Sequence, residues 1–321
     1  MKRSVYLMVL LALLLLAPFV APALGLEYYI GFATRVIATM LIATSLNLLM
    51  GYGGMIALGH AGFVGVGAYV MVALMESGIE SAWVLWAAAA LGAAVVALVI
   101  GAICLRTRGV YFIMITLAFA QMLYYIVVSM RNLGGDDGYN LNARPLLGLG
   151  LDSGNERTLY LVVLIVSVLV FALINRLTQS RFGKTLVGMR DNEARMNALG
   201  YPTYRLRLQA FVLTAAIAGL GGAMLLTQNS FVSPSSMHWT QSAILVVMVV
   251  IGGLGHRYGA VVGAGIWLCL EETLRQYTEY WHWPLGALLI LIILFAPQGI
   301  CNVSFKKRSS NKPLAQEGKA A

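Results

Sequence analysis

The sequence predicts an all-α fold: a polytopic bundle of membrane helices with about ten crossings and a glycine-broken helix. The first reason is composition, because 60% of the 321 residues are hydrophobic and only 11% are charged, with a mean hydropathy of +0.80. Soluble domains carry roughly a quarter charged residues. The second reason is that apolar stretches near the ~20 residues needed to span a bilayer recur along the chain. The third is the clustering of glycine in two of those stretches.

The expected crossings follow one another with short connections. Seven are near the spanning length and the last three are shorter. They lie at 4–24, 28–50, 55–75, 82–104, 109–130, 158–176, 208–230, 241–255, 258–271 and 284–300. The first has a second interpretation, since Lys2-Arg3, an apolar core and Ala21-Pro22-Ala23 also resemble a cleavable signal peptide. Both interpretations leave the topology of the later crossings unchanged.

The basic residues set the orientation, because Lys and Arg are retained on the cytoplasmic side during insertion. With the N-terminus inside, 17 of the 22 Lys and Arg residues fall on that side, so the reverse orientation is disfavoured. The net charge of +9 is therefore mostly a topology signal. A nucleic-acid partner is not expected, because the chain lacks a folded polar face on which basic residues cluster.

The domain organisation is simple. We expect one transmembrane domain over residues 1–301 and a disordered basic cytoplasmic tail over residues 302–321. The largest cytoplasmic feature is the basic loop 179–207, which follows the crossing at 158–176. A chain whose main cytosolic feature is one short loop has no source of energy of its own, so we expect this loop to contact another subunit.

The loop 179–207 is expected to contain a short helix. Asp191 or Asn192 can cap it, Gly200 provides its C-terminal stop, and Pro202 prevents its continuation. The predicted helix covers residues 193–199. It is short enough to press into a groove of a soluble partner, with Met196 and Leu199 as apolar contacts.

Glycine is densest between Asn47 and Tyr69. Gly51, Gly53 and Gly54 are expected to break the helix, and a broken helix at membrane depth is tolerated only where it is packed in protein or lines a polar cavity. The later glycines have the small-residue spacing of close helix contacts; they are Gly62, Gly65 and Gly67. Helix packing alone and a role in a translocation pathway are both compatible with this pattern.

A second segment repeats the pattern. Gly252-Gly253-Leu254-Gly255-His256 is followed by glycines at 259, 263 and 265, and it lies between two short apolar segments. Paired glycine-interrupted segments in the two halves of a membrane chain are typical of a transport pathway. The repeat therefore favours a translocation fold.

His60 has two interpretations. An ionisable group within a membrane segment can protonate or bind substrate. Alternatively, His60 is a neutral imidazole that hydrogen-bonds a carbonyl of the broken helix, as buried polar groups usually find a partner. The sequence leaves both open.

An enzyme is not expected, and neither is a cofactor or a metal site. The chain contains no His-Glu-x-x-His, Gly-x-Ser-x-Gly or Cys-x-x-Cys motif. Gly183-Lys184-Thr185 resembles the end of a phosphate-binding loop, but Thr178 stands where the first glycine belongs and no strand precedes it. The chain is therefore not expected to bind ATP itself.

Several motifs, in order, resemble the LivM-type permease of branched-chain amino acid ABC importers over most of residues 40–300. They are Gly59-His60-Ala61-Gly62-Phe63, Gly134-Gly135-Asp136-Asp137-Gly138, Phe182-Gly183, Arg190-Asp191-Asn192-Glu193, Ala198-Leu199-Gly200-Tyr201, Ala218-Gly219-Leu220-Gly221-Gly222-Ala223, Phe231-Val232-Ser233-Pro234, Gly252-Gly253-Leu254-Gly255 and Phe295-Ala296-Pro297-Gln298-Gly299. Glu193-Ala194 with a later glycine also resembles the coupling loop of such permeases. The loop departs from the usual Glu-Ala-Ala pattern, since Arg195 follows Ala194 and Gly200 lies seven residues after Glu193.

The resemblance implies a permease subunit in a bacterial cytoplasmic (inner) membrane that works with other proteins. Its implied partners are a homologous second permease, two cytosolic ABC ATPase subunits and a periplasmic substrate-binding protein, all at the lipid bilayer. The implied substrates are branched-chain amino acids; related permeases carry urea, short amides or aromatic acids. A stand-alone secondary transporter is the alternative, but it is expected to carry intramembrane carboxylates, and the crossings here have almost none.

Candidate site residues fall into two groups. Residues expected to couple to the ATPase are Glu193, Ala194 and Gly200. Residues expected at the translocation pathway are Asn47, Gly51, Gly53, Gly54 and His60, whose broken backbone and helix ends can receive the carboxylate and amine of a zwitterion.

Overall fold

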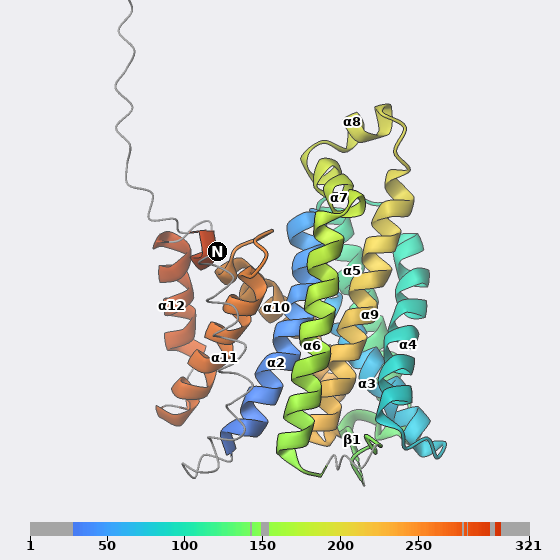
Figure 1. Ribbon diagram of the computed structural model, residues 1–321, viewed down its shortest axis with the longest axis vertical. Coiled ribbons are helices and arrows are strands. Elements are labelled where there is room, and N and C mark those ends of the chain that lie inside the picture. The colour runs from blue at the N-terminus through green and yellow to red at the C-terminus, as the bar shows by residue number, and fades with distance from the viewer. Residues whose placement is uncertain are drawn as a thin grey trace, which may run out of the picture.

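The fold is shown by a computed structural model, which describes residues 28–141, 143–148, 154–277, 279–280, 282–295 and 299–302. The expected crossing at 4–24, with its signal-peptide alternative, and residues 303–321 of the expected tail lie outside the described residues. The described part is a bundle of helices, with α7 and α8 at one end and β1 at the other (Figure 1). This is the predicted all-α membrane architecture, apart from two strands of two residues each.

The elements keep the chain order of the predicted crossings. They are α2 (Tyr28–Asn47), the π turn η1 (Leu48–Tyr52), α3 (His60–Glu76), α4 (Ala82–Cys104), α5 (Val110–Ser129), the 3₁₀ turns η2 (Arg131–Leu133) and η3 (Gly135–Asp137), β1 (Tyr139–Asn140), α6 (Glu156–Gln179), α7 (Arg181–Asp191), α8 (Glu193–Ala198), α9 (Thr203–Asn229), β2 (Phe231–Val232), η4 (Pro234–Met237), α10 (Trp239–Gly252), α11 (Gly259–Tyr277), α12 (His282–Phe295) and η5 (Ile300–Asn302).

Five spans in the described part are long and apolar enough to cross a membrane: Tyr28–Tyr52, α4, α5, α6 and α9. Helices α3 and α10 are apolar but shorter. A multi-pass helical protein is therefore established, whereas the total of ten crossings stays a prediction. The division into a domain at 1–301 and a tail at 302–321 also stays a prediction.

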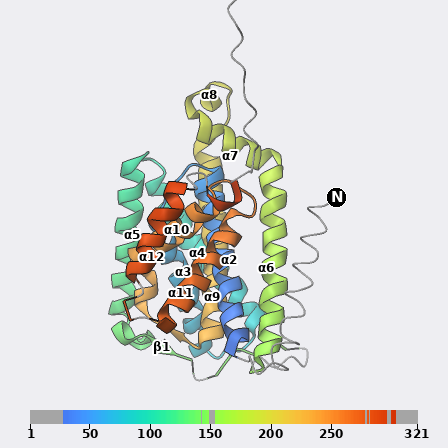
Figure 2. The same ribbon diagram turned by 90° about the vertical axis from the view of Figure 1, so that its left-hand side faces the viewer.

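Helices α2 and α9 form the centre of the bundle and are the most buried of the five long spans. Glycines bring α9 into backbone contact with α3: a Cβ on Gly67 would collide with Gly219 O, and a Cβ on Gly222 would collide with Val64 O. The predicted close helix packing by small residues is thereby confirmed. Figure 2 shows α5 and α6 on the two flanks, with α10, α11 and α12 in front of the centre.

Both predicted glycine breaks are present, with shifted boundaries. Gly51 stays within the π turn, and the first break covers residues 53–59, so the crossing expected from residue 55 begins as a helix only at His60. The second break covers residues 253–258, between α10 and α11. Gly54, Gly253 and Gly255 adopt φ of +68°, +113° and +70°, a region that favours glycine.

The basic loop 179–207 is more ordered than predicted. It holds α7 as well as α8, and α9 already begins at Thr203. At the opposite end, the turn-rich segment around Gly134 forms two 3₁₀ turns and β1, which pairs antiparallel with β2 through Tyr139 opposite Val232.

Candidate functional site

The short helix α8 forms as the sequence predicts. Of the two possible caps, Asn192 is the one used, because its Oδ1 accepts a hydrogen bond from Arg195 N at 2.9 Å. At the other end Gly200 N donates to Asn197 O and Tyr201 N donates to Met196 O, with Gly200 at φ +81°. This is the Schellman arrangement, which ends a helix with a left-handed glycine. Gly200 is therefore the C-terminal stop.

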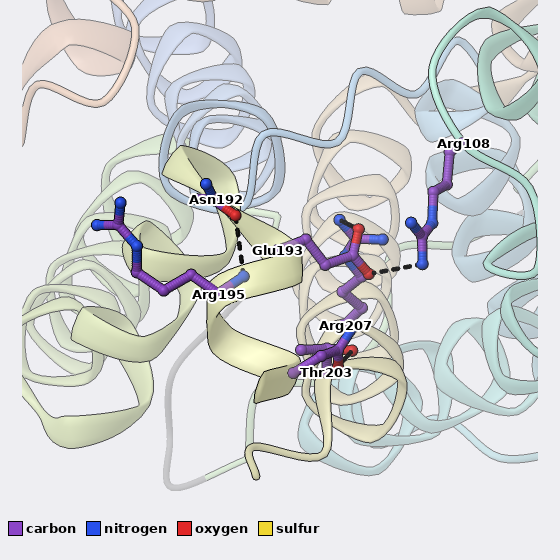
Figure 3. Close-up of polar contacts among 7 residues, drawn as sticks. Arg108, Asn192, Glu193, Arg195, Thr203 and Arg207 are labelled. Atoms are coloured by element: carbon purple, nitrogen blue, oxygen red, sulfur yellow. Dashed lines mark hydrogen bonds and ion pairs between the residues drawn. The ribbon is translucent and has the colours of Figure 1, made fainter. Parts of the chain in front are cut away.

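Glu193 attaches α8 to two other segments of the chain. Its Oε2 pairs with Arg207 Nη2 of α9 at 2.8 Å, and its Oε1 pairs with Arg108 Nη2, just before α5, at 3.3 Å (Figure 3). The Glu193 and Arg207 side chains are each only 15% exposed, whereas Arg108 is 68% exposed. The Arg207 pair is therefore the stronger of the two, since water screens the other. Glu193 orients α8 and faces inward.

The outward side of α8 is different in character. Ala194 and Arg195 are exposed, and Figure 3 shows Arg195 directed away from Glu193. Leu199, which directly follows α8, is 66% exposed, whereas Met196 packs against the core of the bundle. Of Met196 and Leu199, the two apolar residues expected to contact a partner, only Leu199 is exposed.

The first break begins where α2 widens into the π turn η1. Gly53 N donates to Leu48 O, Gly54 N to Met50 O and Met55 N to Leu49 O, which closes the wide turn. π turns within helices are often found at functional sites.

Asn47 joins the two breaks. Its Oδ1 accepts from Gly255 N at 3.0 Å, and its Nδ2 donates to His256 O at 3.0 Å. One side chain thus satisfies a backbone donor and a backbone acceptor of the second break. The two backbones also touch, because a Cβ on Gly51 would collide with both Asn47 Oδ1 and Gly255 N.

His60, at the start of α3, is buried and bonded within the bundle. Its Nε2 lies 2.8 Å from Ser45 Oγ, and that hydroxyl also donates to Ile42 O at 2.7 Å. Because the Ser45 proton is committed to Ile42 O, the hydroxyl accepts from His60, which requires the proton on Nε2. The expectation of a satisfied buried imidazole holds, with a serine hydroxyl in place of the expected carbonyl.

The predicted pathway residues lie together but are mostly covered by their own chain. Asn47, Gly51, Gly53 and His60 are buried, and Gly54 alone among the five is exposed. Two residues further on, Ile56 is 41% exposed. The open side of this region is therefore formed by the middle of the first break.

Sequence reasoning missed the most direct contact between the two groups of residues. Arg190 of α7 donates from Nη1 to Gly51 O at 2.6 Å, across 139 positions of sequence. Arg207, which pairs with Glu193, was also missed. Arg190 stood in a motif of the family resemblance, but no local pattern indicates the partner of either arginine, because each partner comes from a distant part of the chain.

Comparisons with known proteins show the family of the chain. Residues 28–296 match the family described as "Branched-chain amino acid transport system / permease component". The LivM permease of the high-affinity branched-chain amino acid transport system of Escherichia coli is 29% identical, over 93% of this chain and 75% of its own length. The LivM of Salmonella typhimurium is 28% identical over the same shares.

The LivH permease of Escherichia coli is also similar, at 29% identity over 81% of this chain and 90% of its own length. No solved structure matches this chain. The chain is thus similar to both LivM and LivH permeases, and the LivM alignments cover more of it.

Proposed function

Because the chain belongs to the permease family of branched-chain amino acid transport systems, we propose that it is the LivM-type membrane subunit of an ABC importer for branched-chain amino acids. The observation that carries this proposal is the family match over residues 28–296, which includes both glycine breaks and α8. The implied substrate class is leucine, isoleucine and valine.

The α8 end supports coupling to an ATPase. A helix of six residues, capped at both ends and held by the Glu193–Arg207 pair, presents Ala194, Arg195 and Leu199 outward. A short rigid helix with an exposed apolar residue fits a groove on a soluble protein. Among the predicted coupling residues, we assign contact to Ala194, positioning of the helix to Glu193, and termination of the helix to Gly200.

The proposed complex is assembled at the bacterial cytoplasmic membrane and has four further subunits. Similarity to both LivM and LivH supports a homologous second permease as one of them. The others are two cytosolic ATPases on the α7–α8 end and a periplasmic binding protein on the β1 end. In this orientation the basic loop 179–207 is cytoplasmic, as the retention of Lys and Arg requires.

The transport path in this proposal runs between the two permeases beside the first break. There Gly54 and Ile56 are exposed, while Asn47, Gly51, Gly53 and His60 hold the break in shape from behind. When the two ATPases bind ATP, they close against each other and move α8. This movement opens the path alternately to the periplasm and to the cytosol. Weak substrate contacts suffice, because the external protein supplies most of the specificity.

The test is affinity purification of the tagged chain from gently solubilised membranes, with mass spectrometry of the proteins recovered. An ATPase and a homologous permease are expected with the unaltered chain. The Leu199→Asp variant should lose the ATPase and keep the permease, because a carboxylate replaces the exposed apolar contact. Leu146→Asp, 55% exposed and far away beside α4, is the matched control and should keep both.

Recovery of a homo-oligomer alone from all three samples would contradict the proposal and favour a stand-alone transporter. Uptake of labelled leucine in cells that carry the assembled system then tests the substrate. Unlabelled isoleucine and valine should compete, while urea and acetamide should not. Competition by urea and acetamide, but not by isoleucine and valine, would assign the system to small amides.

A further inference from the structure

Arg190 lies at the point where the α7–α8 end meets the broken helices. Its Nη1 donates to Gly51 O at 2.6 Å. Its Nε and Nη2 lie 3.3 and 3.2 Å from Asp191 Oδ1, so the neighbouring carboxylate orients the guanidinium. One side of the group is thus held by α7 and the other reaches the π turn.

The carbonyl that Arg190 binds is one that the helix itself leaves available. Carbonyls of the last turn of a helix have no partner further along the same helix. Gly51 is the fourth of the five residues in η1, so its oxygen belongs to this group. A charged donor makes a stronger hydrogen bond to such an oxygen than a neutral one does.

A glycine of the first break makes room for the arginine, and a glycine of the second break lies beside it. A Cβ on Gly54 would lie 2.6 Å from Arg190 Cγ, which is too close for any side chain. A Cβ on Gly255 would lie 3.4 Å from Arg190 Nη1 and 3.1 Å from Gly51 O. Arg190 therefore touches the first break directly and lies against the second.

Asn47 extends this contact into the second break. It lies one turn before Gly51 and binds Gly255 N and His256 O, each at 3.0 Å. A displacement of Gly51 consequently moves the side chain that holds the second break. Helix α7 is in turn joined to α8 by the single extended residue Asn192, whose N donates to Gly188 O at 3.0 Å, and Met196 of α8 lies against Gly188 of α7.

From these contacts we propose that Arg190 is the positioning residue that transmits movement of α8 to the two glycine breaks. The proposal rests on the proposed coupling to an ATPase and names the residue through which that coupling reaches the path. Arg190 does not contact the substrate. Its bond to Gly51 O makes the first break follow α7, and Asn47 makes the second break follow the first.

The experiment compares Arg190→Gln with Lys184→Gln in the complete complex, purified through the tagged chain and reconstituted in liposomes. Lys184 is an exposed cation on the same helix, so its substitution matches the charge change without touching Gly51. The readouts are recovery of the ATPase, the rate of ATP hydrolysis, and leucine taken up per ATP hydrolysed.

Arg190→Gln should retain the ATPase and hydrolyse ATP, while uptake per ATP falls about tenfold, as expected if one charged hydrogen bond is lost. Lys184→Gln should match the unaltered complex. Arg190→Lys, which keeps one charged donor, should recover part of the uptake. Wild-type uptake per ATP in Arg190→Gln would overturn the role of Arg190. Absence of an ATPase from the unaltered preparation would instead overturn the proposed function.

A second measurement on the unaltered complex applies even if Arg190→Gln does not assemble. Hydrogen exchange is followed with and without a non-hydrolysable ATP analogue. Protection should change together in residues 181–191, 48–58 and 253–259. A change confined to residues 181–191, with the two breaks unaffected, would overturn the proposal.

Discussion

The two glycine breaks share a sequence pattern but differ in structure. Both carry consecutive glycines and a Gly-His pair, at 59–60 and at 255–256. His60 is 1% exposed and bonded to Ser45, whereas His256 is half-buried and accepts from Tyr258 N through Nδ1 at 3.3 Å. His60 already belongs to α3, while His256 stays in the connection before α11.

The difference shows which break depends on the other. The first break follows a π turn at the end of α2, and the buried pair Ser45–His60 joins α2 to α3 across it. The second has two of its backbone groups, Gly255 N and His256 O, bonded by Asn47, the last residue of α2 before the π turn. Substitutions in the first break should therefore have larger effects than equivalent substitutions in the second.

The largest effect is expected for Gly51→Ala. Its Cβ would collide with Asn47 Oδ1 and with the backbone at Gly255 N, so the free energy of unfolding should fall by about 3 kcal/mol or more. Gly255→Ala should cost about 1–2 kcal/mol, chiefly because φ is +70° there. Thermal unfolding of the solubilised protein measures both.

Gly286→Ala in α12 is the control for these glycine variants. Among the described residues no atom lies within 4 Å of a Cβ at that position, so alanine should be neutral or slightly stabilising. Equal losses in Gly51→Ala and Gly255→Ala would break the comparison between the two regions.

The histidines should give the next largest difference. His60→Ala removes a buried ring and leaves Ser45 Oγ without a donor, at a cost of about 2–3 kcal/mol. His256→Ala removes the acceptor of Tyr258 N at a partly exposed site, at a cost of about 1 kcal/mol. Denaturant titration, followed by tryptophan fluorescence, measures the free energy of unfolding of both variants. A larger loss for His256→Ala than for His60→Ala would contradict the inference that the second break depends on the first.

Asn47→Ala should cost about 1–2 kcal/mol, because Gly255 N loses its acceptor and His256 O, which also accepts from Gly259 N, loses one of its donors. Asn47→Asp separates the two hydrogen bonds, since a carboxylate still accepts from Gly255 N but cannot donate to His256 O. Hydrogen exchange at residues 253–259 should therefore rise more in the alanine variant than in the aspartate variant. Unchanged exchange in both would show that the second break holds its own shape.

The smallest effect is expected at α8, away from both breaks. A double-mutant cycle of Glu193→Gln and Arg207→Gln should give a coupling energy of about 1 kcal/mol, because both side chains are 15% exposed. The cycle with Arg108, which is 68% exposed, should give about 0.3 kcal/mol. Thermal unfolding measures both cycles. A larger coupling energy for Arg108 than for Arg207 would show that solvent screening does not decide which pair is stronger.

Much of the fold was predictable because its signals are local. Composition and segment length predicted a helical membrane bundle, and Gly53, Gly54 and Gly253 marked helix ends that the structure confirms. The capped helix before Gly200 was predicted with an error of one residue. Helix α7 was missed, because the sequence between Ser180 and Asp191 is basic and lacks the apolar length that defined the other helices.

The candidate site was only partly predictable. Glu193 was expected to contact an ATPase, but its direction was fixed by Arg207 and Arg108, which come from other segments. Asn47 and Gly51 were selected for their position in a glycine-rich stretch. Their actual partners, Gly255 and Arg190, lie far away in sequence, and nothing in the local pattern indicates those contacts.

The sequence by itself determined that the chain is a bundle of membrane helices, that two glycine breaks interrupt it and that Gly200 ends α8, because capping, glycine conformation and the length of an apolar segment are properties of neighbouring residues. Tertiary structure alone decided that the second break contacts Asn47 and Gly51, that His60 is buried while His256 is half-buried, and that Arg190 binds Gly51. These contacts depend on how helices distant in sequence pack against α2 and α9, and the packing is set by the shapes of many surfaces at once.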